Sequence, residues 1–186
     1  LNSAFTSFGS FTGSTGTHTI GTSDGLVAGN LYRIKWLTRS VIGDSEESSA
    51  LRVGLGAQAE TPSNLVLNID ESGSGKIAVS WDRASDGFLP ILGYTLQMRG
   101  DSFTTVYNGK SDPDTISYIV EGLTPGKYYE FRVYSHNFNG LSQASSTLGA
   151  YACGKPSGLS APRLVSTTSS GITIAWDAPQ SNGGCD

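Results

Sequence analysis

Few side chains in this sequence could carry catalytic or metal chemistry. The 186 residues contain two histidines and two cysteines. A hydrolytic triad holds a base against a nucleophile, but His18 lies in a Ser/Thr/Gly-rich stretch and His136 lies beside a turn. Zinc ligands are usually set as CxxC or HxxxH pairs, and neither pattern occurs. We therefore expect no catalytic residue, no metal ligand and no cofactor.

Two further patterns are incomplete. Asp112 and Asp114 flank Pro113 and lack the later ligands of a calcium-binding loop. A phosphate-binding glycine loop followed by lysine is absent from the sequence. The chain is accordingly not expected to be an enzyme.

The composition favours short strands joined by many turns. The chain has 24 glycines and is rich in Ser and Thr, which are poor helix formers. Its net charge is −4 without a Lys/Arg cluster, so no nucleic-acid partner is expected. No run reaches the roughly 18 apolar residues that span a bilayer. Because the chain starts at Leu1 rather than Met, we expect a processed product or a piece of a longer polypeptide.

An internal repeat divides the chain. Four positions recur at an offset of 97 residues: Gly25 and Gly122, Leu26 and Leu123, Gly29 and Gly126, and Tyr32 and Tyr129. A second block, 77–82, recurs at 172–177 and places Trp81 and Trp176 at an offset of 95. This period fits a whole sandwich domain of about 100 residues.

The order of the two blocks predicts three units. Residues 59–155 form one complete module, residues 1–58 are the C-terminal part of a preceding module, and residues 156–186 are the N-terminal strands of a third. Both outer units carry strand-like apolar residues without a partner in this sequence, and unpaired edges are an aggregation hazard. We expect either that the polymer continues in both directions or that the two ends complete each other between copies.

Strand signals are clearest inside the complete module. Apolar and polar residues alternate at 76–81, 93–98, 118–120 and 129–133, with Gly, Pro, Asn and Asp clustered between them. No segment of useful length has a helical period. The pattern is typical of an all-β sandwich.

Four segments resemble the fibronectin type III family. These are Trp81, the stretch Ser-Asp-Gly-Phe-Leu-Pro-Ile-Leu-Gly-Tyr at 85–94, Leu-Thr-Pro-Gly-Lys-Tyr-Tyr at 123–129, and Asn-Phe-Asn-Gly at 137–140. The resemblance implies tandem immunoglobulin-like β-sandwiches and makes Tyr129 a tyrosine corner, whose hydroxyl bonds to nearby backbone. The structural core residues that it implies are Trp81, Tyr94, Leu123, Tyr129, Tyr32 and Trp176.

One short motif matches a cell-attachment sequence. Arg99, Gly100 and Asp101 form the integrin-type tripeptide, followed by Ser102. In adhesive members of the family this motif lies in the F–G loop, whereas here it falls at the end of strand C. Gly-Asp-Ser is also ordinary turn chemistry. An attachment motif and a plain turn therefore both stay open.

The two cysteines cluster around one module boundary. Cys153 follows the last strand of the complete module, and Cys185 lies in the first long turn of the next. Neither has a cysteine counterpart in the other copy. The two cysteines are thus present together at one boundary and absent together from the other, as expected of a bonded pair. We therefore expect a disulfide that clamps the linker to the following module, although two free thiols remain the alternative. A disulfide would indicate an oxidising compartment.

These observations predict a structural and adhesive module array in a longer extracellular or cell-surface protein. It would be part of a fibre, stalk or filament, with neighbouring modules or other copies of itself as partners. One alternative is a receptor or adhesin ectodomain that binds a protein or glycan ligand through Phe88–Ile91 and Phe138–Leu141. Another is an intracellular, titin-like cytoskeletal array, and an accessory module of a secreted enzyme is a third.

Overall fold

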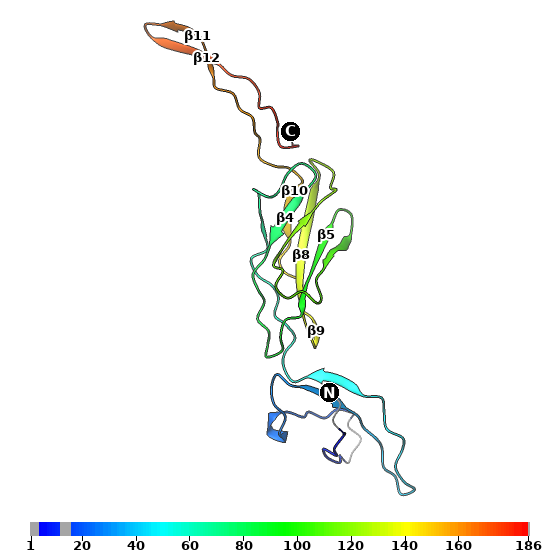
Figure 1. Ribbon diagram of the computed structural model, residues 1–186. Helices are drawn as coiled ribbons and strands as arrows, with labels where there is room; N and C mark the ends of the chain where they lie inside the picture. The colour runs from blue at the N-terminus through cyan, green and yellow to red at the C-terminus, as the bar shows by residue number, and fades with distance from the viewer. Residues whose placement is uncertain (1–3, 12–15, 186) are drawn as a thin grey trace.

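The structure, a computed structural model, describes residues 4–11 and 16–185. Apart from the short 3₁₀ helix η1 (Thr22–Asp24), every regular element in those ranges is a β-strand, so the expected all-β fold is confirmed. Figure 1 shows an elongated chain with a β-sandwich in the middle and a two-stranded hairpin towards each end. No helix in the described ranges is long and apolar enough to span a bilayer. Residues 1–3, 12–15 and 186 of the two outer predicted units lie outside the described part.

The central sandwich consists of two antiparallel sheets. The first has the order β3 (Val66–Leu67), β4 (Ile77–Ser80) and β7 (Ser117–Val120). The second has the order β10 (Leu148–Tyr151), β8 (Tyr128–Asn137), β5 (Gly93–Arg99) and β6 (Phe103–Asn108), and β9 (Gly140–Leu141) also pairs with β8. The longest pairing, between β5 and β8, runs from Gly93 opposite His136 to Arg99 opposite Glu130.

Alternating side chains of the two sheets form the core. In β8, Tyr129, Phe131 and Val133 are buried, while Glu130 and Arg132 between them face outwards. Successive strand residues point to opposite faces, so one face of β8 packs on the first sheet. The opposing layer contributes a group of apolar side chains that includes Ile77, Val79 and Trp81. Trp81 is 2% exposed, and its ring lies 5.8 Å from that of Tyr94.

Each hairpin outside the sandwich is a two-stranded antiparallel ribbon. The first joins β1 (Leu31–Ile34) to β2 (Leu51–Gly54), and the second joins β11 (Arg163–Thr168) to β12 (Gly171–Ala175). Tyr32 is half-buried in the first hairpin. The expectation that Trp176 is a core residue is wrong for this structure, because its side chain is 71% exposed. Beside β12 it meets no second sheet, and a lone hairpin cannot enclose a side chain.

Two matching junctions as the candidate functional site

Junction 1 is the contact between the linker 54–60 and the loop 85–90. The backbone N–H of Ala57 donates to the carbonyl of Gly87 at 2.9 Å, and the N–H of Glu60 donates to that of Ser85 at 3.1 Å. The loop therefore runs along the linker as a strand neighbour would. The Ala57–Gly87 hydrogen bond joins the segment before the sandwich to the sandwich loop, and it therefore restricts how the first hairpin can turn against the sandwich.

Junction 2 is the contact between the linker 153–158 and the loop 180–185. Here the N–H of Gly154 donates to the carbonyl of Gly183 at 2.8 Å, and the N–H of Ser157 donates to that of Ser181 at 2.9 Å. Relative to junction 1, both donors are shifted by 97 positions and both acceptors by 96. The two junctions thus repeat one backbone arrangement.

The two loops share an unusual backbone turn. Gly87 and Phe88 have φ values of 60° and 77°, and Gly183 and Gly184 have φ values of 80° and 89°. Glycine adopts this left-handed region of backbone conformation without steric cost, whereas phenylalanine is strained in it because of its Cβ. The turn aims one carbonyl at a glycine on the other side of each junction. A Cβ at Gly29 would lie 3.1 Å from the Phe88 oxygen, and one at Gly126 would lie 3.3 Å from the Gly184 oxygen.

Polar side chains add to junction 1. The amide of Asn139 donates to the carbonyls of Gly54 and Gly56, both at 2.8 Å, and its oxygen accepts the N–H of Gly54 at 2.9 Å. The amide of Asn137 donates to the carbonyl of Ala57 at 2.8 Å. The turn before β9 therefore holds the linker by hydrogen bonds to its backbone, which do not depend on the linker's side chains.

One apolar side chain closes junction 1. Leu89 is 0% exposed, and Cβ atoms placed at Gly54 or Gly56 would come within 3 Å of its side chain. Leu31 borders the same space, because its Cδ2 would lie 3.1 Å from a Cβ at Gly54. Glycine in the linker thus makes room for a leucine from the sandwich loop. Burying a leucine side chain contributes about 1.5–3 kcal/mol.

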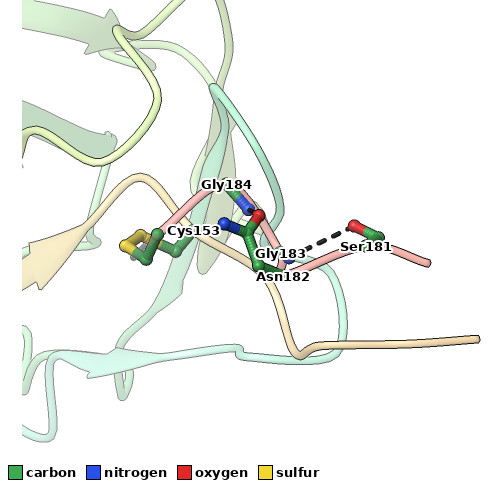
Figure 2. Close-up of a disulfide and its surroundings, with 6 residues drawn as sticks. Cys153, Ser181, Asn182, Gly183 and Gly184 are labelled. Atoms are coloured by element: carbon green, nitrogen blue, oxygen red, sulfur yellow. Dashed lines mark hydrogen bonds between the residues drawn. A yellow bond between two sulfur atoms is a disulfide. The ribbon is translucent and has the colours of Figure 1, made fainter. Parts of the chain in front are cut away.

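A covalent bond closes junction 2. The structure joins Cys153 to Cys185 in a disulfide, with the two Cα atoms 5.6 Å apart, within the range that a disulfide requires. Figure 2 shows the bond next to the loop, where the N–H of Gly183 donates to the Ser181 hydroxyl at 3.2 Å. Lys155 pairs with Asp70 at 2.5 Å, but both side chains are well exposed, so this ion pair contributes little.

A tyrosine hydroxyl recurs ahead of each junction. The Tyr129 hydroxyl accepts the N–H of Thr124, five residues earlier, at 3.2 Å. The Tyr32 hydroxyl accepts the N–H of Val27, again five residues earlier, at 2.7 Å. This is the bond of a tyrosine corner. Residues 60–149 match the sequence profile of the Fibronectin type III domain.

Residues 60–149 are a fibronectin type III domain.

Curated relatives extend the similarity beyond this domain. Protein sidekick-1 of Gallus gallus is 30% identical over 123 residues, which are 64% of this chain and 6% of that protein. Titin of Drosophila melanogaster is 28% identical over 166 residues, 83% of this chain and 1% of that protein. The chain therefore spans a small fraction of the proteins that it resembles.

Among solved structures, the CNTN1 FN1-FN3 domains of chicken match with a TM-score of 0.47 and 20% identity. This match covers 69% of this chain and 45% of that one. Domains A168-A170 of titin also match with a TM-score of 0.47, at 18% identity, and cover 57% of this chain and 36% of that one.

The Arg-Gly-Asp tripeptide lies where β5 of the fibronectin type III domain turns into β6. The Arg99 guanidinium pairs with the Glu130 carboxylate and lies 4.9 Å from the centre of the Phe103 ring. Gly100 and Asp101 are exposed in the turn. The arginine of this tripeptide is thus engaged by the domain's own sheet.

The two histidines have separate surroundings. Nε2 of His136 lies 2.6 Å from the Thr95 hydroxyl, and burial, with the positive charge of Lys110 as a second cause, lowers the pKa of His136. The ring of His18 contacts that of Phe11, with centroids 3.7 Å apart and ring planes tilted by 37°. In the ranges that the structure describes, no three His, Cys, Asp or Glu side chains gather as a metal site.

Sequence reasoning missed Asn139 and Leu89 as junction residues. From sequence alone, the apolar residues in the turns Phe88–Ile91 and Phe138–Leu141 suggest an external ligand. In the structure, Leu89 is buried against the chain's own linker, although Phe88 beside it is 74% exposed. The missing signal was the pair Gly54 and Gly56, since glycine near a strand end permits close approach of another segment.

Proposed function

We propose that this chain is a stiff spacer within a longer extracellular or cell-surface protein that is built from fibronectin type III modules. Residues 59–155 are the complete module, and residues 1–58 and 156–186 belong to the modules before and after it. The protein serves a fibre, stalk or filament, and its partners are neighbouring modules or further copies. It catalyses no reaction.

The observation that carries this proposal is the repeated junction geometry. Domains within a chain usually move against each other unless their interface is large and apolar. Here each linker, 54–60 or 153–158, is instead bonded through its backbone to a loop that follows it in the chain, 85–90 or 180–185. Junction 1 adds Asn139 and Leu89, and junction 2 adds the disulfide. Repeating such joints along a polypeptide would give a stalk of defined spacing.

Small-angle X-ray scattering of the 186-residue chain tests the stiffness. A spacer gives one extended distance distribution that a single conformation fits. A matched variant with Asn139→Ala and Leu89→Ala should broaden this distribution. If the unaltered chain already needs a wide ensemble of bends to fit the data, the spacer proposal is wrong.

An intracellular array is the second candidate, and the similarity to Drosophila titin favours it. The disulfide favours the outside of the cell, because cytosolic thiols are kept reduced. An experiment can distinguish the extracellular proposal from the intracellular one. Protein from its natural source is alkylated and then digested under non-reducing conditions. A peptide pair joined through Cys153 and Cys185 supports the extracellular proposal, whereas alkylated thiols at both positions support the cytoskeletal one.

A further inference from the structure

The hydrogen bonds of the two junctions give a residue-by-residue correspondence. Donors in the linkers correspond at an offset of 97, and acceptors in the loops correspond at an offset of 96. Gly56 is the linker residue just before Ala57, and the offset of 97 places Cys153 at the corresponding position of junction 2. Leu89 lies two residues after Gly87 in the loop, and the offset of 96 places Cys185 at the corresponding position. The two residues that meet at the centre of junction 1 thus correspond to the two cysteines of junction 2.

The distances at junction 1 agree with this correspondence. A Cβ placed at Gly56 would lie 2.8 Å from Cγ of Leu89. In a disulfide, the bond lengths put the Cβ of one cysteine roughly 3 Å from the sulfur of the other. Cγ of Leu89 therefore occupies the place that the sulfur of a cysteine would take. The apolar contact and the covalent bond are alternative ways to fill one position.

Without its disulfide, junction 2 has less to hold it together. The loop 180–185 reads Gln-Ser-Asn-Gly-Gly-Cys, so Cys185 is its one side chain able to replace a buried leucine. Backbone hydrogen bonds, the hydrogen bonds that the Ser181 and Asn182 side chains accept within the loop, and the exposed Lys155–Asp70 pair would remain. Exposed pairs contribute about 0–1 kcal/mol, and a typical hydrogen bond contributes only about 0.5–1.5 kcal/mol net.

We propose that the Cys153–Cys185 bond substitutes for the Leu89–Gly56 contact and makes junction 2 a hinge that opens on reduction while junction 1 stays closed. Both cysteines are half-buried, so a small dithiol can reach them. One thiolate of the dithiol attacks a sulfur of the disulfide, and the other cysteine leaves as a thiolate. The second thiol of the reagent then displaces the first cysteine, which yields two cysteine thiols and an oxidised, cyclic reagent. This inference holds whether or not the chain is a spacer.

Amide hydrogen exchange, followed by NMR on the 186-residue chain, compares both junctions in one sample. The probes are the N–H groups of Gly154 and Ser157 at junction 2, and of Ala57 and Glu60 at junction 1. With excess dithiothreitol, we expect the first pair to exchange faster by about tenfold or more, and the second pair to be unchanged. Equal protection before and after reduction, or a loss at both junctions, would overturn the proposal.

Two double variants distinguish the loss of the covalent bond from the loss of a side chain that occupies the centre of junction 2. Cys153→Ser with Cys185→Ser should reproduce the reduced state without any reagent. Cys153→Gly with Cys185→Leu copies junction 1 and should restore much of the protection of Gly154 and Ser157, with no response to dithiothreitol. If the Gly/Leu variant exchanges as fast as the Ser/Ser variant, the disulfide does not substitute for the apolar contact.

Discussion

Asn139 and Gly54 lie 85 residues apart, yet the side-chain amide of Asn139 both accepts from the N–H of Gly54 and donates to its carbonyl. This pattern copies the exchange of hydrogen bonds between two paired strand residues. The last residue of β2 is thereby paired with a side chain of the fibronectin type III domain. One asparagine thus does for junction 1 what an added strand would do.

Replacing Asn139 by Ala should loosen junction 1 and spare the sandwich. Three hydrogen bonds are lost, and the backbone groups of Gly54 and Gly56 lose their partners, at a cost of about 1–3 kcal/mol for the closed junction. The N–H of Ala57 should therefore exchange faster, while urea unfolding of the sandwich changes by less than about 0.5 kcal/mol. Gln143→Ala, an exposed change just past the same turn, is the control. A slower or unchanged exchange at Ala57 would contradict the role of Asn139.

The Tyr129 hydroxyl should stabilise the domain itself. Tyr129→Phe keeps the buried ring but leaves the N–H of Thr124 without its acceptor, so we expect a loss of about 1–2 kcal/mol in the free energy of unfolding. Urea denaturation measures it. Tyr151→Phe is the matched control, because the Tyr151 hydroxyl makes no hydrogen bond within the described residues and its side chain is exposed. Equal losses in the two variants would show that the corner bond contributes nothing.

The loop of junction 1 stores backbone strain at Phe88. Its φ of 77° is unfavourable for a residue with a Cβ, and the corresponding residue of junction 2 is Gly184. Because the Phe88 side chain is mostly exposed, Phe88→Gly should leave the domain at least as stable, whereas Phe88→Val should be about 1–2 kcal/mol less stable than Phe88→Gly. Denaturation midpoints decide this, and equal midpoints for the two variants would mean that the turn is not strained.

The sandwich itself could be predicted from sequence because its signal is local. Side chains on a strand alternate between core and solvent, so the runs 76–81 and 129–133 reveal both their structure and their buried face. Trp176 follows the same local pattern but is exposed, because burial also needs a second sheet opposite the strand. Alternating apolar and polar residues predict a strand, but they do not show whether a second sheet packs on its apolar face.

The junctions could not be predicted in the same way. Asn139 binds the backbone carbonyls of Gly54 and Gly56, and every residue carries such a carbonyl, so no sequence pattern marks its partner. Leu89 is buried by two glycines that are more than 30 residues away. The paired cysteines are the exception, since their shared absence from the other copy is visible in the sequence.

Acidification should weaken the domain through His136. Burial lowers the pKa of this side chain from its ordinary 6.5, so the unfolded chain binds the proton more readily than the folded one. The contribution of His136 to the free energy of unfolding is therefore fully present above the pKa of this side chain in the unfolded chain. It is lost as the pH falls from about 6.5 towards the lower pKa of the folded state. His136→Gln should remove that part of the pH dependence of urea unfolding between pH 7 and 5. An unchanged slope in the variant would show that another group is responsible.

Arg99 should not serve cell attachment while Glu130 holds it. The guanidinium is paired with Glu130 and lies over the Phe103 ring, so presenting it to a receptor would break contacts within the sheet. We expect Asp101→Glu, which disables an integrin-type motif, to leave cell adhesion to the immobilised chain unchanged. The informative background is Glu130→Gln, which releases Arg99 from the ion pair. If adhesion depends on Asp101 in the unaltered chain, the tripeptide is an attachment site after all; if it does so only with Glu130→Gln, the ion pair is what withholds it.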